Sequence, residues 1–248
     1  MRKIQNIYDD EKFFSQYKEM RDSKINANEL IEIPTIKGML PNLKGKKILD
    51  LGCGEGEMAR FFIEKGAKKV VGIDVSQNMI NEAKKHEYKN LEFKILPMEE
   101  ISSIDDKFDI VFSSLAFHYV EDYYKLMKDI SSKLKKNGYL IFSQEHPLVT
   151  ATIKTQDLPK YIEKDGKRYY YLSDYNDVGK RLIDWNVEGV VKYHRNFETI
   201  FSALKESNLR IEELLESKAS EEAIKIVAKY KNLNNRPFFL FVKAKKIK

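Results

Sequence analysis

Cysteine is nearly absent from this chain of 248 residues, which contains only one, and no apolar run is long enough to cross a bilayer. One cysteine excludes an internal disulfide framework and is typical of a reducing compartment. The first six residues lack the apolar stretch of a signal peptide. We therefore expect a soluble, cytoplasmic protein without a membrane partner. Zinc-ligand spacings, RNA-binding motifs and low-complexity tracts are missing too, so no metal site is expected.

Basic residues outnumber acidic ones, and the formal net charge is +6. Basic surfaces bind phosphate backbones, which makes a nucleic acid one candidate partner. Most of the excess is lysine spread along the chain, whereas bidentate recognition of phosphate or guanine favours arginine. A solvated lysine surface is therefore the preferred interpretation, and nucleic-acid binding is the second.

The most informative stretch is a short apolar run, residues 47–51, that ends in Gly52, Gly54 and Gly56 and passes directly into a helical pattern. This order predicts a strand, a tight turn and a helix. Glycine lets the turn adopt positive φ and lets a ligand approach the main chain. A second strand ends in Asp74, about twenty residues on, where nucleotide-binding βαβ units place an acid that holds a ribose.

The glycine spacing narrows the choice of nucleoside ligand. The dinucleotide fingerprint needs a third glycine where this chain has Glu57, an acid at the place where a pyrophosphate would bind. With alternating glycines, Asp50 before them and Asp74 after the second strand, the chain resembles the class I methyltransferases that depend on S-adenosylmethionine (SAM). SAM has no pyrophosphate and avoids the conflict.

The resemblance implies SAM as cofactor and a set of binding residues, drawn from the leading helix and from the ends of the strands. These are Tyr17, Arg21, Asp50, Gly52, Cys53, Gly54, Asp74, Val75, Ser76, Met79, Met98, Glu99, Ser114 and Leu115. Several have structural alternatives: Tyr17 and Arg21 as core aromatic and surface charge, Met79 as a core residue. Cys53 is interpreted as a small turn residue, because no basic partner stands nearby to activate a thiol. Pro97 departs from the family pattern, which places an acid there.

The fold implied is a Rossmann-like, doubly wound α/β fold with a seven-stranded mixed sheet and an antiparallel C-terminal edge hairpin. Strands are expected at 47–51, 69–74, 91–95, 108–113, 138–143, 210–215 and 237–242. Helices are expected at 8–20, 28–40, 57–65 and 221–230, and also from Ser76, Asp122 and Asn196, with Ser76 and Asn196 as N-caps. We expect one domain over 1–248: a helical cap (1–44), a SAM-binding core (45–146), an inserted substrate lid (147–195) and the rest of the core (196–248).

Catalytic candidates follow strands, because ligands of open parallel sheets bind beyond the carboxyl ends of the strands. Glu145 and His146 follow the fifth strand, and either is a candidate to take a proton from an acceptor. The alternative for this pair is a capping or loop-locking role with Pro147. His118 follows the fourth strand, and a packed structural histidine is the alternative there.

The lid is rich in tyrosine, and Asp165-Gly166 predicts a hairpin turn within it. We expect the extended stretch 181–193 to pair with that hairpin, and residues such as Tyr171, Arg181, Trp185 and His194 to contact a small-molecule substrate. A self-packed lid is the alternative. The leading hypothesis is methyl transfer from SAM to a small molecule by a monomer or weak homodimer. An RNA nucleoside methyltransferase (tRNA included) and a non-catalytic SAM-binding regulator are the alternatives.

Overall fold

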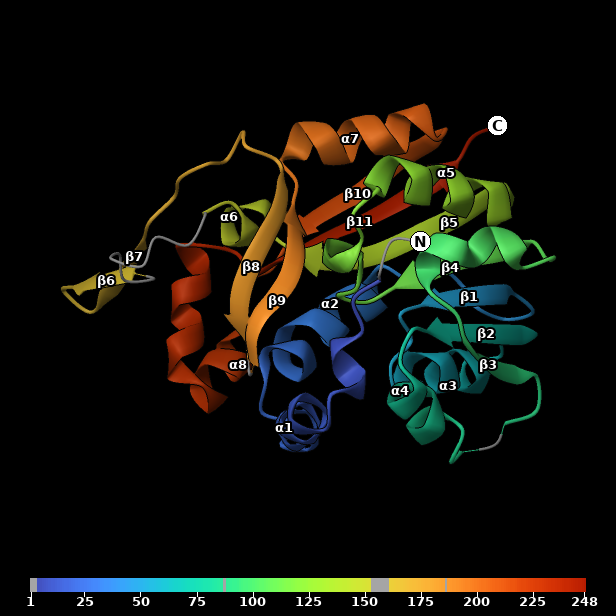
Figure 1. Cartoon of the computed structure of the whole chain (residues 1–248), viewed down its shortest axis with the longest axis horizontal. Helices are drawn as coiled ribbons and strands as arrows, with labels where there is room; N and C mark the ends of the chain where they lie inside the picture. The colour runs from blue at the N-terminus through green and yellow to red at the C-terminus, as the bar shows by residue number, and fades with distance from the viewer. Residues whose placement is uncertain (1–3, 87, 153–160, 186) are drawn as a thin grey trace.

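The computed structural model describes residues 4–86, 88–152, 161–185 and 187–248. Its centre is a seven-stranded sheet in the order β10-β11-β5-β4-β1-β2-β3 (Figure 1). The five strands β1 to β5 run parallel, while β11 is antiparallel to both of its neighbours, β5 and β10. The predicted mixed sheet and its antiparallel C-terminal edge are thereby confirmed.

The parallel strands are β1 (Lys47–Leu51), β2 (Lys69–Asp74), β3 (Leu91–Ile95), β4 (Phe108–Ser113) and β5 (Leu134–Glu145). The first four have the predicted bounds, and β5 extends beyond the expected 138–143 in both directions. β1, β2 and β4 are almost wholly buried, because both of their faces are covered. Continuous apolar runs with few turn residues are typical of such strands.

Helices cover both faces of the sheet and build one apolar core on each (Figure 1). One face holds α5 (Tyr123–Lys133), α7 (Phe197–Glu206) and the 3-10 helix η3 (Met98–Ser103). The other holds α2 (Ile33–Gly38), α3 (Glu57–Glu64), α4 (Gln77–Ala83), α8 (Glu221–Ile226) and the 3-10 helix η5 (Ala228–Asn234). Ser76 and Asn196 accept hydrogen bonds from backbone N–H groups as N-caps of α4 and α7, which confirms both predicted caps.

The edge strands β10 (Leu209–Glu216) and β11 (Phe239–Lys246) pair along almost their whole length. The expected helix over 221–230 is divided between α8 and η5. The expected helix over 28–40 is likewise divided, into the π-helical segment η2 (Asn28–Glu32) and α2. The leading segment comprises the 3-10 helix η1 (Ile7–Asp9) and α1 (Glu11–Asp22) instead of one helix over 8–20.

The lid begins with α6 (Pro147–Thr150) and forms two hairpins. β6 (Tyr161–Lys164) pairs with β7 (Lys167–Tyr170), which confirms the turn at Asp165-Gly166, and β8 (Gly179–Trp185) pairs with β9 (Val187–His194). The prediction that 181–193 pairs with the first hairpin is wrong. This segment reverses direction between the end of β8 and the start of β9, so its own two halves pair, and Gly189 lies in a left-handed conformation within β9. In Figure 1 the β6–β7 hairpin projects from the body while β8–β9 crosses it.

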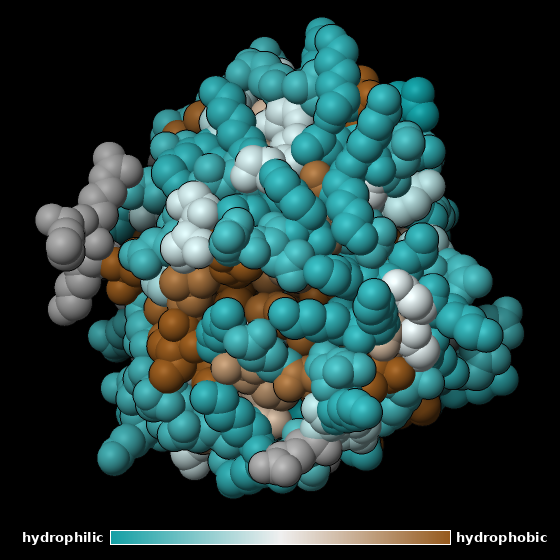
Figure 2. Space-filling view, turned by 90° about the vertical axis from the view of Figure 1, so that its right-hand side faces the viewer, coloured by the Kyte–Doolittle hydropathy of each residue, from teal (hydrophilic) through white to brown (hydrophobic). Residues whose placement is uncertain are grey.

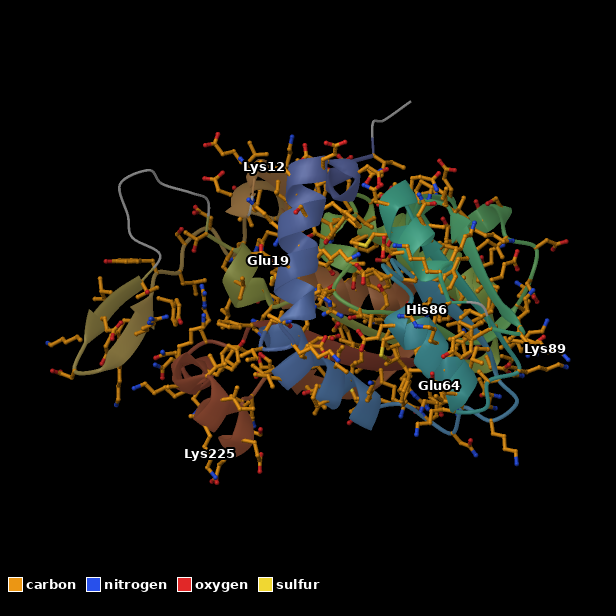
Figure 3. All side chains as sticks on the ribbon, turned by 90° about the horizontal axis from the view of Figure 1, so that it is seen from below. Lys12, Glu19, Glu64, His86, Lys89 and Lys225 are labelled. Carbon is orange, nitrogen blue, oxygen red and sulfur yellow. The ribbon has the colours of Figure 1, made fainter. Side chains whose placement is uncertain are left out.

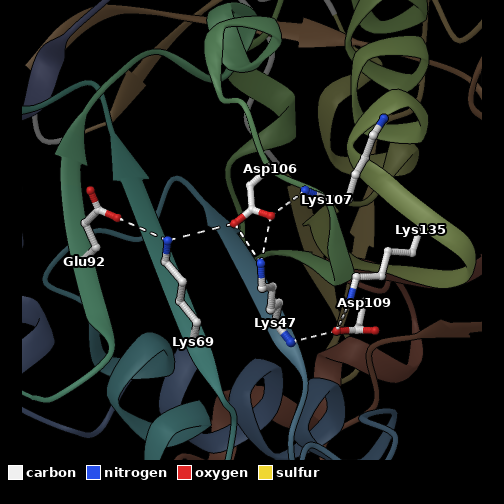
Figure 4. A network of polar contacts seen from close by, with 7 residues as sticks. All are labelled: Lys47, Lys69, Glu92, Asp106, Lys107, Asp109 and Lys135. Carbon is white, nitrogen blue, oxygen red and sulfur yellow. Dashed lines mark hydrogen bonds and ion pairs between the residues drawn. The ribbon is translucent and has the colours of Figure 1, made fainter.

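A charged network ties the first residues of the strands together at the end of the sheet where they begin (Figure 4). Lys47 of β1 pairs with Asp106 at 3.0 Å, and its backbone N–H donates to Asp109 of β4 at 2.8 Å. Asp109 also pairs with Lys135 of β5 at 2.9 Å, and Lys69 of β2 lies 3.9 Å from Asp106. The opposite end, where the strands finish, is left for ligands.

The face shown in Figure 2 is mostly hydrophilic, with hydrophobic side chains gathered in a recess near its middle. Among the helices of the described residues, none combines the length and the apolar character that a membrane crossing requires.

Candidate functional site

A cavity of about 1300 Å³ lies at the carboxyl ends of β1, β2, β4 and β5. This volume exceeds the roughly 300–1,000 Å³ of an ordinary small-molecule site, so the cavity has room for two ligands side by side. Its floor is the turn after β1. η1 and α1 cover one part, and β8, β9 and the segment 171–173 cover another. A site enclosed in this way removes reactants from water.

The turn after β1 is locked to the end of β2 by Asp74. Its two carboxylate oxygens accept the backbone N–H groups of Gly54 and Ser76, each at 2.9 Å. A carboxylate has about four acceptor positions, so about two remain for hydroxyl groups of a ligand. A Cβ at Gly54 would meet nothing closer than Met79 Sδ at 4.0 Å and would project into open space. The main chain there is accessible to a ligand.

Asp50 ends inside the cavity as an unpaired acid. Its side chain is buried, and Oδ2 has no hydrogen-bond partner among the described residues. Burial raises the pKa of Asp50 to about 8, and the carboxylates of Asp74 and Glu32 add to the shift. Burial also raises the pKa of Glu32 to about 7, although Ser143 and Ser114 donate hydrogen bonds to its Oε1. Such a group of acids favours a cation in the cavity.

The N-terminal segment is fastened across this end of the cavity. Asp9 accepts hydrogen bonds from Ser76 Oγ at 2.6 Å and from the backbone N–H of Asn78 at 3.0 Å, at the start of α4. Lys18 pairs with Glu82 of α4 at 3.0 Å. Figure 3, in which Lys12 and Glu19 mark α1, shows this helix crossing the molecule beside α3 and α4. The segment thus forms a cover attached to α4.

Tyr17 and Arg21 lie on that cover and line the cavity. Arg21 pairs with Glu57 at 3.0 Å and Glu29 at 3.3 Å, and burial raises the pKa of Tyr17 to about 12. The other members of the predicted SAM set that line the cavity are Asp50, Gly52, Cys53, Gly54, Asp74, Val75, Met79, Met98, Glu99, Ser114 and Leu115. Residues from six separate segments therefore meet around one space.

Some of these residues are already engaged within the protein. The backbone N–H of Leu115 donates to the carbonyl and hydroxyl oxygens of Ser143, both at 3.1 Å, which leaves carbonyl groups there for a ligand. Burial raises the pKa of the Cys53 thiol, so it stays protonated and is no nucleophile. Ser76 is fully buried behind the cavity wall and acts as a cap.

Another part of the cavity is built from β5, β9 and the 3-10 helix η4 (Phe117–Tyr119). Glu145 Oε1 pairs with Lys192 Nζ at 2.5 Å, while Oε2 is buried and unpartnered among the described residues. Burial raises the pKa of Glu145, but the charge of Lys192 and its hydrogen bond to Glu145 outweigh burial, and the net pKa lies below the ordinary value. Glu145 is therefore ionised at neutral pH.

His118 lies beside Glu145, and its Nδ1 accepts the Glu145 backbone N–H at 3.5 Å. Burial lowers the pKa of His118 to about 3, and the nearby charges of Lys192 and Arg195 reinforce this. The ring is neutral at pH 7. Because Nδ1 accepts, we assign the proton to Nε2, which makes this histidine a hydrogen-bond donor more than a base.

Besides Ser76, three predicted site residues lie away from the cavity lining. His146 is fully buried, caps α6 through Nδ1, and contacts Glu216 through Nε2 at 2.9 Å. This arrangement matches the capping role that was the alternative to a catalytic one. Arg181 donates to the backbone carbonyls of residues 151, 174, 177 and 180. His194 contacts Thr150 and a backbone carbonyl. Tyr171 does line the cavity, and the side chain of Trp185 lies outside the described part of the chain.

Sequence reasoning missed Lys192, Arg236, Tyr8 and Tyr119, all of which line the cavity. Arg195 is by sequence a candidate substrate contact of the lid, but it lies outside the cavity lining and donates to the backbone carbonyls of Phe117 and Val120, which holds η4 in place. Lys192 had a detectable signal, because it stands between Val190 and His194 on the inward face of β9. Arg236 had none, since it lies in a loop before Pro237.

No group of three or more His, Cys, Asp or Glu side chains within the described ranges is arranged to hold a metal ion.

Comparison with known proteins identifies the class. A family model described as a methyltransferase domain matches residues 42–226. The crystal structure of an S-adenosylmethionine dependent methyltransferase from Mesorhizobium loti has a TM-score of 0.80 and 32% identity, over 89% of this chain and 98% of that one. The matched core and the sheet order define a class I methyltransferase fold.

Of two further relatives, one aligns with nearly the whole chain and the other with about half of it. An uncharacterized protein of Haemophilus influenzae is 38% identical over 249 residues, 98% of this chain and 97% of its own. A ubiquinone biosynthesis O-methyltransferase of Acinetobacter baylyi is 32% identical over 138 residues, 53% of this chain and 56% of that protein. The chain belongs to the SAM-dependent methyltransferases, enzymes whose cofactor and methyl donor is SAM.

Proposed function

We propose that this methyltransferase transfers the methyl group of SAM to a small molecule bound beside it in the same cavity. The observation that carries the proposal is the cavity itself, which is large enough for two ligands and is covered by α1 on one side and by β8–β9 on another. A cover of this kind suits a small acceptor better than an RNA strand. The partial likeness to a ubiquinone biosynthesis O-methyltransferase agrees with it.

The residues around the β1 turn fit the cofactor. Asp74 has acceptor positions left for the two ribose hydroxyls, and the open main chain at Gly54 lets the sugar approach. The unpaired Asp50 suits the positive charge of SAM, and Met98 and Met79 line the space for an adenine ring. Arg21, which lines the cavity and pairs with Glu57 and Glu29, is our candidate for the partner of the carboxylate of the methionine part.

SAM supplies an activated methyl group on a sulfonium, so the chain mainly aligns the acceptor and excludes water. Positioning of this kind contributes up to about 7–11 kcal/mol of the barrier. Glu145 Oε2, ionised and unpartnered, takes the proton of an acceptor hydroxyl or amine, and His118 orients the acceptor by donation from Nε2. His146 has no part in this step, because it caps α6.

Calorimetric titration with SAM, followed by an assay of S-adenosylhomocysteine release from a library of small hydroxyl and amino compounds, tests the proposal. We expect micromolar binding of SAM and turnover of compounds from the library. Absence of SAM binding would end the proposal. Turnover confined to RNA, with binding that weakens steeply with salt, would replace it by an RNA methyltransferase.

A further inference from the structure

The charges of the cavity differ from one end to the other. Around the β1 turn two acids line the cavity: Asp50, whose Oδ2 has no partner among the described residues, and Asp74, which accepts two backbone N–H groups. Around the end of β5 and the β8–β9 hairpin the lining includes two acids, Glu145 and Asp184, and two bases, Lys192 and Arg236, while His118 is neutral. Asp184 at the rim is exposed and accepts the Gly189 N–H at 3.3 Å. Because Asp184 is exposed to solvent, the inner part of the acceptor end has two cations, Lys192 and Arg236, and one carboxylate, Glu145, which leaves one positive charge in excess there.

The excess charge belongs to Arg236. Lys192 is held by Glu145 at 2.5 Å, whereas Arg236 Nε is buried and has no hydrogen-bond partner among the described residues. The guanidinium lies 3.9 Å from the centre of the Tyr170 ring, which orients it by cation–π contact. A buried Nε–H group without a hydrogen-bond acceptor is costly unless a ligand supplies one. Burial of Arg236 lowers its pKa, in keeping with this cost.

Glu145 has the complementary vacancy. Its Oε2 is a buried acceptor without a partner among the described residues. Glu145 in β5 pairs with Phe239 in β11, and Phe239 follows Arg236 by three residues. One donor and one acceptor are thus unused at the same end of the cavity. A ligand that satisfies both carries an anion at one position and a hydroxyl or amine at another.

We propose that the methyl acceptor is a small carboxylic acid, whose carboxylate binds Arg236 and whose hydroxyl or amino group donates to Glu145 Oε2. The inference rests on the proposed function and names the acceptor's class. The planar guanidinium matches a carboxylate with two parallel hydrogen bonds. A monoanion balances the single positive charge, whereas a phosphate dianion would leave a negative excess. Methyl transfer forms a bond from the acceptor oxygen or nitrogen to carbon, breaks the sulfur–carbon bond, and passes the acceptor proton to Glu145.

The test is a library of hydroxybenzoates, hydroxycinnamates, hydroxyalkanoates and amino acids, each paired with its uncharged amide and, for the aromatic members, with its phosphate analogue. S-adenosylhomocysteine release is measured at saturating SAM for the wild type, Arg236→Met and Arg236→Lys. The control is Arg168→Met, since Arg168 also lies over a tyrosine ring, Tyr161 at 4.3 Å, but does not line the cavity.

We expect each acid to be turned over at least about tenfold faster than its amide. In Arg236→Met we expect kcat/KM for the acid to fall about 10- to 100-fold, mostly through a higher KM. Arg236→Lys restores part of the loss, and Arg168→Met is unchanged. Equal turnover of amides, a preference for phosphates, an unaltered preference in Arg236→Met, or no acid turned over would each overturn the inference. SAM affinity, measured first, separates these outcomes from a failure of the proposed function.

Discussion

Asp50 gives the sharpest prediction, because its proton competes with the cofactor. In the SAM-free protein its pKa is about 8, raised by burial first and by Asp74 and Glu32 in addition. A bound cation holds the carboxylate ionised, so SAM binding must release the proton. The apparent affinity is then divided by 1 + 10^(8 − pH), a factor of about 300 at pH 5.5 and about 11 at pH 7. We expect SAM to bind about 30-fold more tightly at pH 7 than at pH 5.5.

Calorimetry checks this expectation directly. Between pH 5.5 and pH 7 an α-amino group such as that of SAM mostly keeps its proton, so the change of SAM affinity with pH reports on groups of the protein. Titrations at pH 7 in buffers of different ionisation enthalpy should reveal the release of about 0.9 proton on binding. Asp50→Asn should reduce the 30-fold difference to a few-fold.

Glu32→Gln is the matched control, because Glu32 is buried near Asp50 but does not line the cavity. In Glu32→Gln the affinity for SAM should still rise with pH, but the rise should occur at lower pH, since one of the charges that raise the pKa of Asp50 is lost. An identical slope in wild type and Asp50→Asn would refute the assignment of the cation to Asp50.

The same group affects folding with a defined sign. A carboxyl whose folded pKa is raised keeps a proton that the unfolded chain loses above about pH 4. Its contribution to the free energy of unfolding therefore falls as pH rises from about 4 towards 8. In thermal unfolding without SAM, Asp50→Asn should lose this decline.

Three other perturbations are informative. Asp74→Ala should weaken SAM binding by about 1.5–3 kcal/mol through lost hydrogen bonds to a ligand, and calorimetry that shows an unchanged affinity would contradict the ribose assignment. Glu145→Gln should lower kcat about 100-fold or more for acceptors that must lose a proton, with SAM affinity retained; an unaltered kcat would remove Glu145 as the base. Asp109→Asn should lower the free energy of unfolding by about 0.5–1 kcal/mol in urea at pH 7. Burial raises the pKa of Asp109, but the hydrogen bonds from Lys135 and from the Lys47 N–H outweigh burial and lower the folded pKa. The stabilisation is therefore present above about pH 4 and is lost as pH falls through the lowered folded pKa. An equal difference in unfolding free energy between wild type and Asp109→Asn at about pH 3 would exclude this ion pair as its source.

Local patterns were sufficient for the core of the fold. Four strands have the predicted bounds, because three of them are mostly apolar runs and β3 alternates apolar and charged residues, and all four end at polar or turn-forming residues. The caps at Ser76 and Asn196 and the turn at Asp165-Gly166 depend on neighbouring residues, so the sequence contains all the information that they need. The wrong pairing of 181–193 concerned a contact between distant segments. Strand pairing of that kind depends on which partner offers a compatible register.

The sequence by itself determined that a glycine turn and an acid after the second strand would meet, since consecutive parallel strands end at one edge of the sheet. Only the tertiary structure decided which polar side chains of the lid and loops reach the cavity. It buried His146 as the N-cap of α6 and Arg181 among backbone carbonyls of the lid. It also brought Lys192 and Arg236, 47 and 91 positions after Glu145, to the same end of the cavity. Side-chain direction and long-range packing set these positions, and spacing along the chain does not encode them.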